Sequence, residues 1–324
     1  ANQNWTEFDP NTRWRWRVSQ SSDRPADRQV WMNGEFVSGD QATVPLLSHG
    51  FSRGSAIFET FGVHESAHGP VAYRLDRHLA RLSRSAELLD MVLAYDHAQI
   101  TAAISETVRR NRVGRGLVKV MAYWGEEAVV SLVPSAKLDV AVFAFPDGGQ
   151  IHLDDVTPIS ACLAPWRKLH PETVPVEAKV CANYLNGYLT RKHAIDHGFD
   201  VGLMLDLEGR LAEGSTESVF LVRDGVLCTP QAGQILASIS RMSVLEIADV
   251  AGILVEEVDL GPEDLATAEE MFTSHTGVKV HPIGRFEERD LSAPGPVTTK
   301  LIGLVDDILH FRDERFSHFF QSLA

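Results

Sequence analysis

The stretch that decides the fold of this 324-residue chain reads VPVEAKVCANYLN over residues 174–186. It places one lysine, Lys179, just after an extended run that contains Pro175 and just before Asn183 and Tyr184, where a helix is expected to begin. Proline fixes its own φ and biases the preceding residue toward extended backbone. An isolated lysine would be interpreted as a surface residue, so it is the surrounding pattern that suggests a chemical role for Lys179.

Further stretches extend the pattern outward. They read LAEGSTES at 211–218 with an RDGV turn at 223–226, SISR at 238–241, SHTG at 274–277, and PVAYRLDRH upstream at 70–78. Together they resemble the pyridoxal-phosphate enzymes of fold type IV: branched-chain aminotransferases, D-amino-acid transaminases and aminodeoxychorismate lyases. The resemblance covers roughly residues 30–305, and its motifs are closest to the branched-chain aminotransferases. It implies an α+β, D-amino acid aminotransferase-like fold with a small N-terminal α/β domain and a larger C-terminal domain. It also implies that the chain binds pyridoxal 5'-phosphate and moves an amino group between an amino acid and a 2-oxo acid.

The resemblance assigns residues to the reactive parts of the cofactor. Lys179 is the catalytic lysine, which forms a Schiff base with the cofactor and then moves a proton on the substrate. Glu213 matches the acidic residue whose negative charge keeps the pyridine nitrogen protonated, and Tyr184 matches the tyrosine near the phenolate oxygen. A partly desolvated lysine near a cationic cofactor has a lowered pKa, as a general base of this kind requires.

Two loops are expected to contact the cofactor phosphate. The SISR stretch stands where the family has Gly-Ile-Thr-Arg, at the start of a helix expected from residue 241. A helix N-terminus favours an anion, and this gives Ile239 and Ser240 as contacts, although Ser238 replaces the family's glycine. The SHTG stretch gives Thr276 as another contact, with His275 in place of a glycine.

An arginine is expected to complete the phosphate site. Arg74 matches the family's phosphate-binding arginine and can donate two hydrogen bonds to one anion. Arg77, Arg81 and Arg84, which follow it, are expected on solvated faces of a helix.

The substrate side departs from the branched-chain pattern. Those enzymes carry Tyr-x-Arg on a strand of the first domain, whereas this chain has Leu-Val-Lys ending at Lys119. A lysine keeps the charge but loses the planar fork of arginine. Arg53 stands where a tyrosine is usual, and Phe58 and Thr60 belong to a Phe-Glu-Thr sequence in place of Phe-Glu-Gly. These four residues and Gly277 are the predicted substrate contacts.

Three alternatives to a branched-chain aminotransferase remain open from the sequence. Thr60 and the missing Tyr-x-Arg favour an aminodeoxychorismate-lyase-like enzyme, while Asn183 and Tyr184 oppose it. The altered carboxylate site also leaves room for a D-amino-acid or (R)-amine transaminase. A non-catalytic protein that kept the fold would not need Lys179, Glu213 and Tyr184 together.

Composition limits the partners of the protein. The net charge of −14 argues against nucleic acid and anionic membranes as ligands, because both require a basic surface. The three cysteines lack metal-ligand spacing and are expected to be reduced thiols in the cytoplasm. His64/His68 and His193/His197 lack a third ligand, so no metal site is expected. The resemblance implies a homodimer.

The hydrophobic pattern predicts the elements that carry these motifs. Strands are expected at 29–32 and 35–37 around an Asn33-Gly34 turn, and at 117–123, 140–145, 157–163, 201–205, 218–222 and 226–228. Helices are expected at 75–89, 100–108 (ended by Gly114), 183–197, 241–250 and 298–309. The expected organisation is a polar extension at 1–28, a small domain at 29–145, a linker at 146–152 and a larger domain at 153–324.

Overall fold

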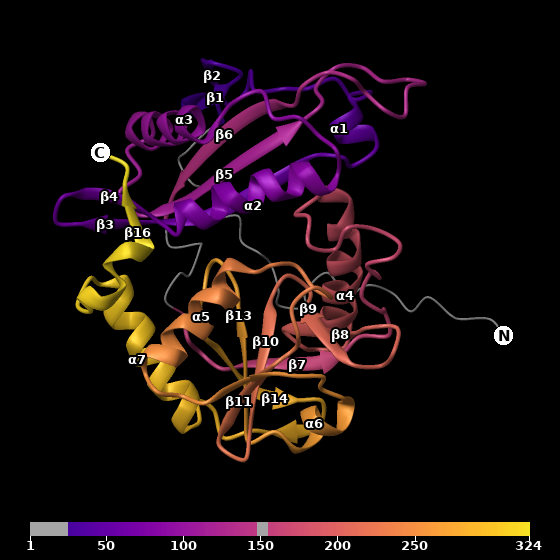
Figure 1. Cartoon of the computed structure of the whole chain (residues 1–324), viewed down its shortest axis with the longest axis vertical. Helices are drawn as coiled ribbons and strands as arrows, with labels where there is room; N and C mark the ends of the chain where they lie inside the picture. Colours follow the sequence, from indigo (N-terminus) through magenta and orange to yellow (C-terminus); the bar gives the residue numbers. More distant parts are fainter. Residues whose placement is uncertain (1–24, 148–154) are drawn as a thin grey trace.

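The computed structural model describes residues 25–147 and 155–324, which form two β-sheets with helices packed on them (Figure 1). The first sheet is antiparallel throughout. Its strands run in the order β16 (Phe320–Ser322), β4 (Gly69–Tyr73), β3 (Ile57–Ser66), β5 (Gly116–Tyr123), β6 (Asp139–Pro146), β1 (Gln29–Met32) and β2 (Glu35–Ser38).

The second sheet is mixed. Its strands run in the order β12 (Val255–Glu257), β11 (Val226–Thr229), β10 (Ser218–Arg223), β13 (Glu270–Ser274), β14 (His281–Phe286), β7 (Ile159–Leu163), β8 (Val201–Leu205) and β9 (Leu211–Gly214), and β15 (Arg289–Asp290) pairs with β14. The helices are α1 (His49–Ser52), α2 (Leu75–Leu88), α3 (His97–Arg110), α4 (Tyr184–Asp196), α5 (Ile239–Val250), α6 (Pro262–Thr267) and α7 (Pro296–Leu309). Short 3-10 turns lie at η1 (Pro25–Asp27), η2 (Cys181–Asn183) and η3 (Glu314–Phe319).

Helices α2 and α3 cover one face of the first sheet. The predicted stripe on α2 is buried against β3, with Leu75, Leu79 and Leu82 at most 4% exposed. The predicted hairpin of β1 and β2 is confirmed, and its two turn residues, Asn33 and Gly34, have φ of 52° and 96°. Positive φ at both positions is what a two-residue hairpin turn requires. The first core is therefore built from the patterns seen in the sequence.

Among the described residues, the opposite face of the first sheet carries no helix longer than the four-residue α1. Met32, Met121 and Phe143 lie on it only partly buried. Together with Phe51, Tyr123 and other residues they line an apolar cavity of about 370 Å³. An apolar face of this kind is a candidate for association with another protein surface.

The second sheet has a core on each face, because alternate residues of a strand point to opposite sides. On β10, Phe220 and Val222 pack against α5 and α7, whereas Val219 and Leu221 pack on the side of α6. Helix α4 lies against β8 and β7. Its buried residues are Gly187, Thr190 and Ala194.

Most expected elements are confirmed, with several bounds shifted by a few residues. Helix α5 begins at Ile239, two residues before the predicted start, because the Ser238 hydroxyl caps the helix by accepting a hydrogen bond from the Arg241 N–H at 3.2 Å. Helix α3 ends at Arg110, four residues before Gly114, and the backbone N–H of Asn111 closes its last turn. The apolar residues of α4 face outward: Leu185 is 63% exposed and Tyr188 60%.

The C-terminal segment returns from the second sheet to the first. After α7, the η3 turn leads into β16, which pairs with β4 through Phe320 opposite Tyr73 (yellow beside β4 in Figure 1). The predicted linker at 146–152 lies largely outside the described residues, as does most of the predicted extension at 1–28, so the domain boundaries stay predictions. Within the described ranges, no helix is long and apolar enough to cross a membrane.

Candidate active site

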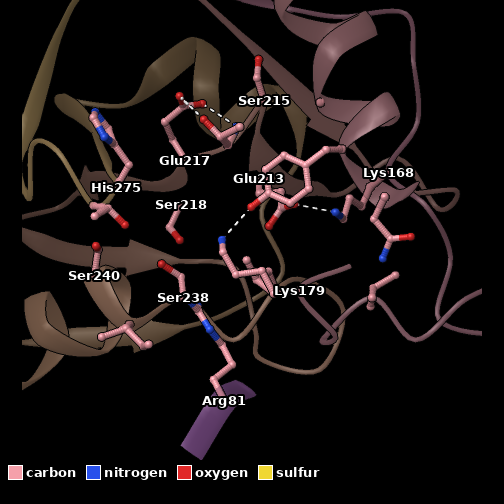
Figure 2. Close-up of a pocket in the computed structure, with 18 of the residues that line it drawn as sticks. Arg81, Lys168, Lys179, Glu213, Ser215, Glu217, Ser218, Ser238, Ser240 and His275 are labelled. Carbon is pink, nitrogen blue, oxygen red and sulfur yellow. Dashed lines mark hydrogen bonds and ion pairs between the residues drawn. The ribbon is translucent and has the colours of Figure 1, made fainter. Parts of the chain in front are cut away.

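A cavity between α2 and the second half of the chain contains Lys179 (Figure 2). Its lining comes from α2, the segment at 176–187, β8 to β10, the start of α5 and the loop after β13. Six of the predicted cofactor residues line it: Lys179, Tyr184, Glu213, Ile239, Ser240 and Thr276. The first and the last of these residues, Lys179 and Thr276, are 97 positions apart in the sequence, and the fold brings all six to one place.

The backbone around Lys179 is held by the first half of the structure. Its N–H donates to the Ser85 hydroxyl of α2 at 3.0 Å, and its carbonyl accepts from the Phe58 N–H of β3 at 3.0 Å. The Cys181 N–H donates to the Ala56 carbonyl at 2.7 Å. The lysine is therefore fixed by hydrogen bonds to α2 and β3 instead of sitting on a free loop.

Desolvation makes the Lys179 amine unusually easy to deprotonate. Burial, together with the nearby Arg81 charge, lowers its pKa from 10.5 to about 7. Its Nζ donates a hydrogen bond to the Tyr184 hydroxyl at 2.6 Å. Burial raises the pKa of Tyr184 well above its usual value, so the phenol stays protonated. The site therefore presents an amine that is substantially neutral near pH 7, and a neutral amine is both a nucleophile and a base.

Glu213 lies on β9 at one end of the cavity and contacts a second lysine. Its Oε1 accepts a hydrogen bond from Lys168 Nζ at 2.5 Å, and the two side chains are 13% and 8% exposed. The pairing keeps a carboxylate at this end of the cavity, as Figure 2 shows. The sequence interpretation included Glu213 but missed Lys168.

The other end of the cavity is suited to an anion. The first turn of α5 lies there with Ile239 and Ser240, and the leading N–H groups of a helix lack acceptors within the helix. Arg81 reaches the same end from α2, and its Nη1 donates to the Ala237 carbonyl at 2.9 Å, just before the helix. A helix N-terminus and a guanidinium thus converge on one region of the cavity (Figure 2).

Glu59 fixes the position of Arg81. The two make a bidentate pair, with Nε to Oε1 at 2.7 Å and Nη2 to Oε2 at 2.6 Å. His78 Nδ1 also lies 2.7 Å from Glu59 Oε2. Burial acts to raise the pKa of Glu59, but the charge and hydrogen bonds of Arg81 and His78 outweigh it and lower the pKa from 4.5 to about 2. The carboxylate stays ionised and holds the guanidinium in place.

Arg74 does not line the cavity, contrary to what the phosphate assignment requires. Its Nη1 bonds Glu246 Oε2 at 2.8 Å, and its guanidinium stacks 4.2 Å from the centre of the Phe319 ring. Arg81, which was expected on a solvated face, is only 9% exposed, whereas Arg77 and Arg84 are exposed. The physical reason is that Arg74 precedes α2 and faces the C-terminal segment, while Arg81 lies two turns further along the helix.

The α2 sequence does contain a signal for Arg81. His78, Arg81 and Ser85 are spaced i, i+3 and i+7, so they form a polar strip beside the apolar stripe. All three are buried, and they contact Glu59 or the Lys179 backbone. A polar strip next to a buried stripe indicates a site instead of a solvated face.

The predicted substrate residues lie around the cavity without lining it. Phe58 packs on the Tyr184 ring at a centroid distance of 4.9 Å, and its own ring centre is 4.8 Å from Lys119 Nζ and 4.9 Å from Lys179 Nζ. Arg53 is exposed. The Thr60 carbonyl accepts a hydrogen bond from the Thr276 hydroxyl at 3.3 Å.

The loop after β13 differs from expectation through its histidine. His275 lines the cavity, and its Nδ1 accepts hydrogen bonds from the N–H groups of Gly277 at 3.1 Å and Val278 at 3.4 Å. Burial lowers the pKa of His275 to about 4, so the ring is neutral near pH 7. The Gly277 N–H is therefore already engaged by a side chain of its own loop.

Comparisons with known proteins agree with this geometry. The class IV aminotransferase family model matches residues 56–286. The branched-chain-amino-acid aminotransferase of Salmonella typhimurium is 31% identical over 277 residues, which cover 84% of this chain and 90% of that enzyme. The branched-chain aminotransferase of Thermoproteus uzoniensis, solved with norvaline, aligns with a TM-score of 0.87 and 30% identity over 92% of this chain and 99% of that one. The pyridoxal-phosphate form of the Thermobaculum terrenum enzyme aligns with a TM-score of 0.84 and 27% identity over 93% and 100% of the two chains. The chain belongs to the class IV aminotransferases, the pyridoxal-phosphate-dependent enzymes of fold type IV.

Proposed function

We propose that this aminotransferase acts on branched-chain or similarly apolar amino acids and on a 2-oxo acid acceptor. The names of its relatives support the substrate class. The observation that carries the proposal is the position of Lys179, a neutral buried amine between an anion-binding end and a carboxylate. An amino-group transfer by this cofactor needs these three parts in this order.

The residues of the cavity fit pyridoxal 5'-phosphate. The helix N-terminus of α5 with Ile239 and Ser240, together with Thr276, would hold the phosphate, and we assign its arginine to Arg81 instead of Arg74. Arg81 qualifies because it lies at this end of the cavity, whereas Arg74 is committed to Glu246.

The opposite end of the cavity fits the ring of the cofactor. Glu213 would face the pyridine nitrogen, Tyr184 would donate to the phenolate oxygen, and Lys179 would bond the aldehyde carbon. The carboxylate of Glu213 favours a protonated ring nitrogen because opposite charges attract at short range. Lys168 shares that carboxylate and therefore limits how strongly it acts on the ring.

The side chains of this protein divide the chemical work between them. The cofactor supplies the electron sink that stabilises negative charge at the substrate Cα. Lys179 Nζ, once displaced by the substrate amine, is the base that accepts the Cα proton and moves it across one face of the site. Its lowered pKa leaves a large neutral fraction near pH 7, which this step requires.

The substrate contacts remain proposals. Lys119 and Phe58 lie next to Lys179, so Lys119 would attract a carboxylate of the substrate and Phe58 would contact its side chain. Thr60 acts through its carbonyl on Thr276. Arg53 would approach the substrate from the exposed side. Because the Gly277 N–H is bound to His275, a substrate carboxylate reaching it would have to displace the imidazole.

We also propose that the protein works as a homodimer in the cytoplasm. The partly buried apolar face of the first sheet and the outward-facing apolar residues of α4 supply surface for a second copy. Further exposed apolar side chains lie on the connection between β5 and β6, at Val129, Val130, Leu132 and Val133. Three free thiols suit a reducing compartment. Sedimentation of the purified protein tests the dimer.

The test of the function follows the visible absorption of the cofactor-loaded protein. L-leucine, D-alanine and an aryl-alkyl amine are added separately, and 2-oxoglutarate is added afterwards. We expect L-leucine to remove the absorption of the lysine-bound cofactor and 2-oxoglutarate to restore it. The Lys179→Ala variant should show neither change.

Two results would overturn this proposal. A response to D-alanine or to the amine but not to L-leucine would reassign the substrate. An absorption that no amino donor changes, in a protein that binds the cofactor, would favour the lyase reaction.

A further inference from the structure

Another buried lysine, Lys279, lies behind the loop that ends the cavity. It is 4% exposed and belongs to the connection between β13 and β14. Its Nζ donates a hydrogen bond to the carbonyl of Thr276, a residue that lines the cavity at the end we assign to the phosphate. The ammonium group is thus one peptide unit away from the cavity wall.

Lys279 has no counter-charge of its own in the described part of the chain. No carboxylate there lies within ion-pair distance of its Nζ, which also lies 4.8 Å from the centre of the Tyr73 ring. A buried ammonium without a partner is costly, and proteins place such groups mainly where a function requires them. Nearby, His64 Nε2 is also buried without a hydrogen-bond partner.

We propose that Lys279 is a positioning residue whose positive charge is balanced by the negative charge of the cofactor phosphate. The lysine acts on the phosphate site through the loop of residues 274–277, which lies between them. The inference rests on the proposed placement of the phosphate beside Ser240 and Thr276. A phosphate bound there brings negative charge to the far side of the same loop. The attraction holds the Thr276 peptide in place, because the lysine already bonds its carbonyl.

The proposal implies that cofactor binding is linked to proton uptake. Burial lowers the pKa of Lys279 to about 7 in the cofactor-free protein. A nearby phosphate raises that pKa, because an opposite charge favours the protonated amine. The contribution of Lys279 to phosphate binding is therefore strongest below about pH 7 and weakens as the pH rises from there through the pKa of the loaded protein.

The groups that face Lys279 do not titrate in this range. His64 of β3 has a pKa of about 3 and His275 a pKa of about 4, so both are neutral, and burial raises the pKa of Tyr73. Arg115, just before β5, and His310, just after α7, act on His64, and they are shared by every variant compared below. Differences between variants therefore report on the charge at position 279, including its effect in lowering the pKa of His64 and His275.

The experiment measures the affinity of the cofactor-free protein for pyridoxamine 5'-phosphate by calorimetry. This probe has a phosphate but no aldehyde, so it does not bond to Lys179. The wild type is compared with Lys279→Gln, which can still donate to the Thr276 carbonyl but carries no charge, and with Lys279→Arg, which stays charged. Measurements run from about pH 6 to about pH 9, on either side of the lysine's lowered pKa. Thermal unfolding without ligand checks that each variant is folded.

At the acid end we expect the wild type and Lys279→Arg to bind the probe with the same affinity. Lys279→Gln should bind it on the order of tenfold more weakly, which corresponds to a shift of about one unit in the pKa of Lys279 on binding. At the alkaline end the wild type should fall toward Lys279→Gln while Lys279→Arg keeps its affinity. Pyridoxamine without phosphate should not distinguish the wild type from Lys279→Gln.

If Lys279→Gln matches the wild type at every pH, the lysine serves only as a hydrogen-bond donor and the inference is wrong. If Lys279→Arg does not fold, the comparison of Lys279→Gln with the wild type decides alone. Failure of the wild type itself to bind the probe would instead contradict the proposed function.

Discussion

Replacing Glu59 with glutamine should lower the stability of the protein and weaken its binding of the cofactor phosphate. Glu59 is fully buried on β3 and accepts two hydrogen bonds from Arg81 and one from His78. Glutamine keeps the size of the side chain, but it loses the charge and replaces one acceptor by a donor. The Arg81 guanidinium would then be buried without its counter-charge and without a fixed position.

The size of the effect follows from the pKa of the carboxyl. A fall from 4.5 to about 2 corresponds to about 3 kcal/mol of stability, at about 1.4 kcal/mol per pH unit. Removing one partner of a buried ion pair costs about 3–5 kcal/mol, which agrees. Because the folded-state pKa is lowered, this contribution is complete above pH 4.5 and is lost as the pH falls from 4.5 toward 2.

Urea unfolding of the cofactor-free protein measures this difference. At neutral pH we expect the midpoint of Glu59→Gln to fall by about 1 M, since urea slopes are about 1–3 kcal/mol per M and grow with protein size. The gap from the wild type should narrow below pH 4.5. Glu65→Gln, an exposed position on the same strand, is the matched control. Equal midpoints for the two variants, or a gap that does not change with pH, would refute the reasoning.

Three further results are expected. Arg81→Gln should weaken binding of pyridoxamine 5'-phosphate by about 10- to 100-fold through loss of charged hydrogen bonds, while the exposed Arg77→Gln should bind normally; the reverse order in equilibrium dialysis would remove Arg81 from the phosphate site. Glu213→Gln should lower turnover with L-leucine far more than it lowers cofactor affinity, and equal losses in both would show that Glu213 is structural. The rate at which Lys179 bonds added pyridoxal 5'-phosphate should rise with pH and level off above about pH 7, because only the neutral amine reacts; a rate that keeps rising to about pH 10 in stopped-flow absorption would mean that the lysine has an ordinary pKa.

The sequence alone located the residues that lie within a contiguous motif. Lys179 and Tyr184 belong to one short stretch, and Glu213 sits in a strand–turn segment with its own pattern. Their neighbours along the chain constrain their position, so few alternatives exist. The hairpin at Asn33 and the stripe of α2 were equally readable, because turn chemistry and helical period act locally.

Residues that act through distant partners were harder to find. Arg81 is buried only because Glu59, 22 positions away, supplies its counter-charge. The position of Lys168 in the site depends on its ion pair with Glu213, and the local sequence around either residue gives no sign of the other. The orientation of α4 also depends on a distant segment. Gly187 allows the helix to approach the carbonyl of Ser215 so closely that a Cβ atom at position 187 would meet it at 2.1 Å. Close backbone contact, not apolar side chains, decides which face of α4 is inward.

The return of β16 to the first sheet imposes an order on biosynthesis. Strand β4 ends at Tyr73, and its outer partner is made roughly 250 residues later, which is an interval of roughly 10–50 s at about 5–20 residues per second. During that time a nascent chain carries an unpaired strand edge, the feature through which sheets join to other chains. A ribosome that stalled before Phe320 would leave the β4 edge of the first sheet open, so a strand synthesised late closes a sheet whose other strands were made much earlier.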